Sequence, residues 1–82
     1  KNIIIANEYL WFEKLWEWAD NNEIDENIIP RNIRDLTLLK RLDLSAKNLP
    51  SIPKELCNLV SLYELNLYDN MISTLPDEIH KL

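Results

Sequence analysis

The chain contains one 23-residue pattern twice in succession, and this repetition limits its fold more than any other feature. The first copy runs from residue 39 to 61 and the second from 62 to 82, with no insertion between matched positions. Both copies carry an aliphatic residue or proline at eight matched positions: Leu39 and Leu62, Leu42 and Leu65, Leu44 and Leu67, Leu49 and Ile72, Ile52 and Leu75, Pro53 and Pro76, Leu56 and Ile79, Leu59 and Leu82. Such a period predicts stacked units, each burying an apolar side against the next.

The same spacing appears before the first full copy, in residues 29–36. The 23-residue offset relates four of these residues to the first copy: Ile29 to Ile52, Pro30 to Pro53, Ile33 to Leu56 and Leu36 to Leu59. We therefore interpret residues 29–36 as the second half of a preceding repeat, and the polar, acidic residues 23–28 as a connector.

Residues 1–22 are predicted to form one amphipathic helix, because two apolar rows recur at helical spacing. Asn2 or Asn7 could cap its start, and Asn21 and Asn22 are candidate stops because Asn tolerates the left-handed conformation. A stack of repeats exposes its core at each end, so we expect this helix to cover the first end. The two rows are Ile5, Tyr9, Phe12, Trp16 and Ala19, and next to it Trp11, Leu15 and Trp18.

Alternating apolar residues predict short strands over Arg41–Ser45 and Glu64–Tyr68. Each proline that follows should open a helical turn, since proline suits the first position of a helix. The segments after Pro53 and Pro76 space apolar residues by three, as a short helix or 3₁₀ turn does.

Composition limits the function classes. The 82 residues suit a single domain, 1–82, and the net charge is −5, with the acids concentrated between residues 8 and 26. Without a basic patch we expect no nucleic-acid binding and no binding to anionic membrane. The single cysteine, Cys57, favours a reducing compartment, so we expect a cytoplasmic protein, with secretion as an effector kept open. Because the sequence begins with Lys, we expect a piece of a longer protein.

The repeats resemble leucine-rich repeats, whose pattern is L-x-x-L-x-L-x-x-N-x-L. The second copy matches it throughout, and the I/L-P-x-x-[LI]-x-x-L tail is similar to that of typical repeats in bacterial and intracellular signalling proteins: the matches are Leu62, Leu65, Leu67, Asn70 and Ile72. The resemblance covers residues 29–82. It implies an α/β fold, a short right-handed leucine-rich-repeat solenoid with parallel strands on its concave side and helical turns on its convex side. Members of the family mostly bind other proteins.

The sequence departs from that pattern at three places. Lys47 occupies the first copy's asparagine position, so its bend should be built differently or be exposed beside the helix. Cys57 and His80 occupy a convex position where the family often has glycine. The chain ends at Leu82 without a terminal cap, which leaves an apolar end and a strand edge open to further repeats or another molecule.

The concave surface is the first candidate site. If the leucines of both strands point inward, the alternate residues point outward, and residues 23 apart lie side by side. Arg41 should then neighbour Glu64, an exposed pair worth under about 1 kcal/mol unless it takes part in recognition. Tyr and Arg are enriched in binding hot spots, which favours a protein-binding surface. We assign to it Arg41, Asp43, Ser45, Glu64, Asn66, Tyr68 and Asp69.

Other candidates are weaker. Cys57 and His80 are 23 residues apart and should be neighbours, but nothing supplies an orienting group or the remaining ligands of a zinc site, so packing is the better interpretation. Ser45 with Asp43 and His80 would lie on opposite sides of the repeat. The row of Trp11, Leu15 and Trp18 should be buried under the repeats. If it is exposed, it marks a surface for a partner or for self-association.

We therefore expect a protein-interaction module that is not an enzyme and needs no cofactor or metal. Two alternatives stay open. One is the targeting domain of a larger enzyme or effector. The other is a structural element that forms oligomers through its open end or its tryptophan row.

Overall fold

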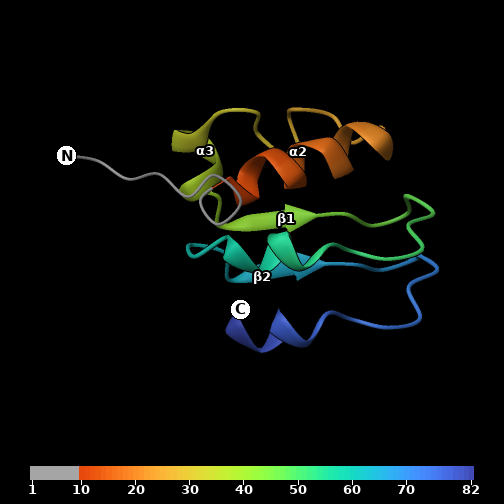
Figure 1. The fold of residues 1–82 in the computed structure, drawn as a ribbon. Helices are drawn as coiled ribbons and strands as arrows, with labels where there is room; N and C mark the ends of the chain where they lie inside the picture. The colour runs from red at the N-terminus through yellow and green to blue at the C-terminus, as the bar shows by residue number, and fades with distance from the viewer. Residues whose placement is uncertain (1–9) are drawn as a thin grey trace.

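The structure, a computed structural model, describes residues 10–82, and the polypeptide alternates strands with short helices (Figure 1). The predicted helix positions before residue 10, with the candidate caps Asn2 and Asn7, lie outside the described residues. The elements in chain order are α2 (Trp11–Asn21), α3 (Ile33–Thr37), β1 (Arg41–Asp43), the 3₁₀ helix η1 (Lys54–Asn58), β2 (Glu64–Asn66) and the 3₁₀ helix η2 (Asp77–Lys81).

The two strands form a parallel pair in the register that the repeat predicts. Arg41 pairs with Glu64 and Asp43 with Asn66, so each residue lies beside its 23-residue equivalent. Both strands are shorter than predicted, three residues instead of five. The backbone bonds nevertheless continue past the strand ends, because the N–H of Ala46 donates to the carbonyl of Tyr68 at 2.9 Å. The expected side-by-side placement of the two copies is confirmed.

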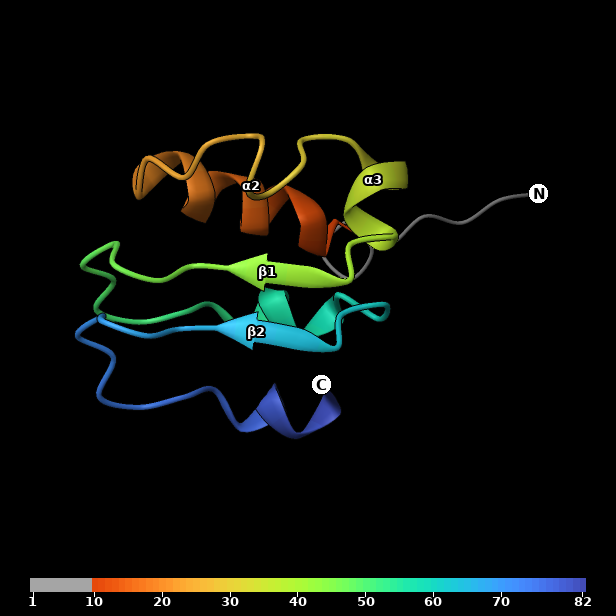
Figure 2. The ribbon, with the colours of Figure 1, turned by 180° about the vertical axis from the view of Figure 1, so that it is seen from behind.

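The elements succeed one another as layers along one direction. Both ribbon views place α2 and α3 on one side of β1, with β2 on the other side and η2 farthest from α2 (Figures 1 and 2). The 3₁₀ helix η1 packs between α2 and η2. Helix α2 thus covers the first repeat, as expected, while no described element covers the second repeat on its far side.

Helix α2 buries its two apolar rows unequally. Leu15 and Ala19 are fully buried, and the half-buried aromatic side chains around them pack against the core: Trp11, Phe12, Trp16 and Trp18. The second row is therefore not an exposed stripe. Trp16 also donates from its indole N–H to the carbonyl of Pro30 at 2.9 Å, which satisfies its polar atom where it packs.

Helix α2 ends at Asn21, as predicted, but the residue that reverses the chain is Glu23. Asn22 has a φ of −104°, whereas Glu23 has a φ of 56°. The N–H of Glu23 donates to Asp20, and the N–H of Ile24 donates to Ala19 at 2.8 Å. These two bonds form a Schellman motif, and the buried Ile24 supplies its apolar contact. The expectation that Asn21 or Asn22 adopts the left-handed conformation is wrong.

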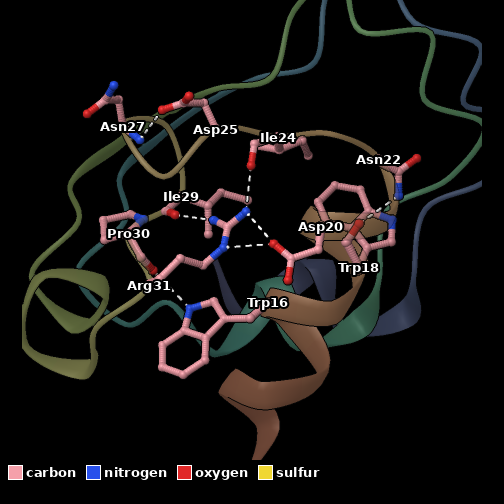
Figure 3. Close-up of polar contacts among 10 residues, drawn as sticks. All are labelled: Trp16, Trp18, Asp20, Asn22, Ile24, Asp25, Asn27, Ile29, Pro30 and Arg31. Atoms are coloured by element: carbon pink, nitrogen blue, oxygen red, sulfur yellow. Dashed lines mark hydrogen bonds and ion pairs between the residues drawn. The ribbon is translucent and has the colours of Figure 1, made fainter.

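Arg31 joins α2 to the connector and the half-repeat (Figure 3). Its guanidinium donates to the Asp20 carboxylate at 3.0 Å, to the Ile24 carbonyl at 2.5 Å and to the Ile29 carbonyl. The Arg31 side chain is largely buried, while the Asp20 side chain is 70% exposed. The carbonyl bonds therefore contribute more than the solvent-screened ion pair.

The helical turns begin one or more residues later than the prolines predict. Pro53 and Pro76 have extended ψ angles of 152° and 148° and precede η1 and η2 as cap residues. In the half-repeat, α3 begins at Ile33, after Asn32, whose side chain accepts from the N–H of Asp35 at 2.9 Å. The prediction that proline occupies the first helical position is wrong, because extended ψ angles keep it outside the turn.

The core is fuller in the first repeat than in the second. Ile52 is 6% exposed and Leu59 is 1% exposed, whereas their equivalents Leu75 and Leu82 are 50% and 42% exposed. The half-repeat keeps Leu36 buried like its equivalent Leu59. Its Ile33 is exposed, because α3 is out of phase with η1. The open end of the molecule is therefore its second repeat.

Candidate binding surface

The predicted outward residues form one exposed surface beside the paired strands. We call it the strand face, and six of its seven residues are exposed while Ser45 is half-buried: Arg41, Asp43, Ser45, Glu64, Asn66, Tyr68 and Asp69. The leucines between them on the first strand, Leu42 and Leu44, are buried. Leu65 and Leu67 of the second strand are only half-buried. The predicted facing of the strands is confirmed, with fuller burial in the first.

One end of the strand face carries a charged and aromatic cluster. Arg41 Nε lies 3.7 Å from Glu64 Oε1, and its guanidinium carbon lies 5.3 Å from the ring centroid of Tyr63. The ion pair is exposed and contributes little stability. The stacking holds the guanidinium flat over an exposed ring. Sequence reasoning missed Tyr63, although its place directly before Glu64 could have pointed to it.

The middle of the strand face is ordered by side chains that bond to the next bend. Oδ1 of Asp43 accepts from the Ser45 backbone N–H at 2.9 Å and from its hydroxyl at 2.6 Å. These bonds, the hydroxyl first, hold the pKa of Asp43 below its ordinary value. Asn66 repeats the arrangement by accepting from the Tyr68 N–H at 2.9 Å. The bonded surface is therefore pre-ordered for contact.

A shallow pocket of about 320 Å³ adjoins this cluster. Arg41, Asp43 and Glu64 of the strand face contribute to its lining. The rest of the lining comes from residues that the sequence gave no reason to choose: Asn27, Ile28 and Leu39. The connector at residues 23–28 thus contributes a wall to the candidate site, which periodicity could not indicate because it belongs to no repeat.

Tyr68 and Asp69 lie at the other end of the strand face. Tyr68 is 79% exposed, and Asp69 has a φ of 59°, which turns the chain away from the strand. Asp69 also lines a second pocket, formed with residues of the following bend. The structure therefore separates the seven predicted residues into an Arg41–Glu64 end and a Tyr68–Asp69 end.

Asn70 explains how the bend at Lys47 is built. Its Oδ1 accepts from the N–H of Lys47 at 3.1 Å and of Leu49 at 2.9 Å, and its Nδ2 donates to the Leu44 carbonyl at 2.7 Å. It also donates to Leu67 at 3.1 Å within its own repeat. An asparagine serves the preceding bend, so the first bend needs Asn70 and not an amide at position 47.

The remaining candidates give no assembled chemistry. Cys57 is buried in the core, whereas His80 is exposed, with Nδ1 2.7 Å from the Asp77 carbonyl oxygen. This difference favours the packing interpretation of the pair. Within residues 10–82, no cluster of three or more His, Cys, Asp or Glu side chains could hold a metal ion. Among the described helices, none has the length and apolarity needed to span a bilayer.

Comparison with known proteins identifies relatives for the repeats. Over 48 residues, 58% of this chain, the sequence is 50% identical to the DISP complex protein LRCH3 of Homo sapiens. Over the same length it is 48% identical to leucine-rich repeat and calponin homology domain-containing protein 1 of Mus musculus. It is 35% identical over 57 residues, 70% of the chain, to leucine-rich repeat-containing protein 10 of Homo sapiens.

These matches cover small parts of the relatives. The chain spans 6% of LRCH3 and 21% of leucine-rich repeat-containing protein 10. No family model matches the chain, and no solved structure matches it significantly. The expected bacterial type finds no support, because these relatives are mammalian. The relatives of this chain are leucine-rich-repeat proteins.

Proposed function

We propose that the chain is a protein-interaction module that binds a partner protein through its strand face. The observation that carries this proposal is the guanidinium of Arg41, stacked over Tyr63 and next to Glu64 on an exposed sheet. Tyrosine and arginine supply much of the binding energy at protein interfaces. Relatives that are leucine-rich-repeat proteins support the same class, and the name of LRCH3 makes that protein part of a complex.

The strand face suits binding because its backbone is already fixed. Asp43 and Asn66 each hold the N–H two residues later, and Asn70 links the two bends. Ordering a flexible surface costs free energy on binding, so a surface held in this way loses less. Nothing in this arrangement requires a reaction, and we propose no catalytic role.

The test compares variants of the strand face with a matched variant elsewhere. The whole chain serves as bait, a captured partner is identified by mass spectrometry, and its Kd is then measured with purified proteins. Arg41→Ala and Tyr63→Ala should each weaken binding by about tenfold or more, as hot-spot truncations do. Val60→Ala, at a site 85% exposed and outside the strand face, should leave the Kd unchanged. Equal Kd values for all three variants would contradict the proposal.

We further propose that the described residues are one end of a leucine-rich-repeat solenoid. The parallel register at the 23-residue offset and the packing of η1 against η2 support this. A solenoid accepts an additional unit because each repeat contacts only its neighbours. Inserting a second copy of residues 39–61 after residue 61 should therefore give a folded protein at least as stable as the original. An unfolded product would contradict the proposal.

A structural role is the second candidate, and one observation favours it. Met71, Leu75 and Leu82 expose large apolar side chains at the open end. Such surfaces promote association. Light scattering across a concentration series distinguishes the two: a monomer at high concentration would exclude assembly by the chain alone. A targeting module in a larger enzyme would leave the strand face unchanged and would be recognised from the sequence of the full-length gene.

A further inference from the structure

The far edge of β2 carries an unfilled counterpart of the seat that holds Asn70. In the first bend, the carboxamide of Asn70 donates to the Leu44 carbonyl and accepts from the N–H groups of Lys47 and Leu49. The strands and bends of the two repeats are related by 23 positions. The corresponding groups of the second bend are the Leu67 carbonyl and the N–H groups of Asn70 and Ile72.

A pocket lies where this counterpart is expected. It has a volume of about 550 Å³, and its lining includes Leu67, Asn70 and Ile72, the three residues that the offset selects. Leu75 also lines it and is half exposed, whereas its equivalent Ile52 is buried. The pocket thus combines an amide-sized set of backbone groups with unburied apolar surface.

The adjoining strand edge can accept another strand. The carbonyls of Asn66 and Tyr68 accept from the N–H groups of Leu44 and Ala46, so these two residues face β1. Backbone groups alternate in direction along a strand, and those of Leu65 and Leu67 therefore face the opposite edge. An extended peptide can add to such an edge through main-chain hydrogen bonds.

We propose that this open edge binds an extended segment of a partner protein that runs parallel to β2. The segment carries leucines at alternate positions and an asparagine three residues after the second leucine. Its leucines cover Leu65 and Leu67, and its carboxamide enters the pocket in the way that Asn70 enters the first bend. This binding uses the end of the sheet and is independent of the strand face.

The chemistry of the pocket selects an amide. A carboxamide supplies both an acceptor for two N–H groups and a donor for a carbonyl, as Asn70 does in the first bend. An ionised carboxylate lacks the donor and meets the Leu67 carbonyl oxygen with a like partial charge. An aliphatic side chain leaves all three groups unpaired, which is costly when they are desolvated.

A second copy of this chain is a poorer occupant than a separate segment. Its first repeat presents Lys47 at the required position, and an ammonium group cannot accept from N–H groups. Its second repeat already uses Asn70 on its own first bend. The partner must therefore bring an uncommitted asparagine.

The first test uses the second repeat as a free peptide. A fluorescent peptide with the sequence of residues 62–75, LYELNLYDNMISTL, is titrated into the whole 82-residue chain and followed by anisotropy. We expect saturable binding that weakens by about tenfold or more when the peptide carries Asn70→Asp. Absence of binding, or equal affinity of the two peptides, would overturn the proposal.

The second test changes the protein. Leu75→Lys places a charge in the pocket at a half-exposed site, so the fold should survive, as circular dichroism can verify. It should abolish peptide binding, whereas Val60→Lys, at a more exposed site outside the pocket, should not. Unchanged binding to Leu75→Lys would overturn the proposal. So would self-association of the chain that Leu75→Lys abolishes, since the edge would then belong to a second copy. Arg41→Ala, on the strand face, should leave peptide binding intact.

Discussion

Asn70 and Lys47 lie 23 positions apart, and Oδ1 of Asn70 accepts a hydrogen bond from the Lys47 backbone N–H at 3.1 Å. The same side chain bonds to Leu49 and Leu44, so one half-buried amide joins the second repeat to the bend of the first. This linkage does not depend on apolar packing. It gives the two repeats a fixed register where the strands have already ended.

Asn70→Leu tests that linkage. The leucine keeps the volume but leaves the N–H groups of Lys47 and Leu49 without their acceptor, so the free energy of unfolding should fall by about 2–3 kcal/mol. Urea denaturation followed by circular dichroism measures it. Asn66→Ala is the control, because Asn66 is exposed and accepts from one N–H, and it should cost under about 1 kcal/mol. Equal losses would show that Asn70 does not join the repeats.

Arg31→Lys should destabilise the junction between α2 and the repeats. A lysine cannot reach Asp20 and the carbonyls of Ile24 and Ile29 together, since it lacks the guanidinium fork. We expect a loss of about 1–2 kcal/mol in the free energy of unfolding. Arg34→Lys, at an exposed position of α3, should change it by under about 0.5 kcal/mol. Thermal unfolding of both variants provides the comparison, and a similar effect of both would contradict the role of Arg31.

Periodicity predicts the parts of this fold that repeat. The pairing of Arg41 with Glu64, the inward direction of Leu42 and Leu44 and the end of α2 all follow from spacing alone. Much of the strand face could be predicted for the same reason, because alternation in a strand fixes which residues point outward.

The remaining features depend on the ends of the repeats, where the pattern stops. Glu23 reverses the chain because Ile24 and Ala19 pack and bond there, a tertiary effect that outweighs the preference for asparagine. The contribution of Asn27 to the pocket beside Arg41 arises from a connector without periodicity. The greater exposure of Leu75 relative to Ile52 depends on its position in the stack and not on its type.

Ser45→Ala should raise the pKa of Asp43. The hydroxyl and N–H of Ser45 favour the ionised carboxylate, so the folded pKa is below the unfolded one. The stabilisation from these bonds is therefore present above the unfolded value of about 3.9 and is lost as the pH falls through the folded pKa. Without the hydroxyl the folded pKa moves back towards its ordinary value. A titration of the Asp43 carboxyl carbon by NMR measures this.

The matched control for Asp43 is Ser45→Thr, which keeps a hydroxyl at the same position. Its pKa should stay close to that of the original protein. If Ser45→Ala and Ser45→Thr give the same pKa, the hydroxyl does not hold the carboxylate, and the order assigned to the middle of the strand face is incorrect.

Leu42→Ala should cost more stability than Leu65→Ala, although the two residues pair across the sheet. Leu42 is buried between α2 and the second repeat, so its truncation leaves a cavity and should cost about 3–5 kcal/mol. Leu65 is half-buried at the open side, and water can fill the space, so about half that cost is expected. Chemical denaturation of both variants decides it. Equal losses would mean that the second repeat is covered in solution.

Ala46→Gly should stabilise the protein. Ala46 has a φ of 54°, in the left-handed region where a Cβ atom meets the following carbonyl oxygen, at a cost of about 1–2 kcal/mol. Glycine removes that clash and keeps the Ala46 N–H bond to Tyr68, but it also increases the freedom of the unfolded chain. The net gain should be about 0.5–1 kcal/mol in the free energy of unfolding. Ala19→Gly is the opposite case, since Ala19 is buried within α2, and it should lower the stability. If Ala46→Gly were also destabilising, the bend would not hold residue 46 in the left-handed conformation.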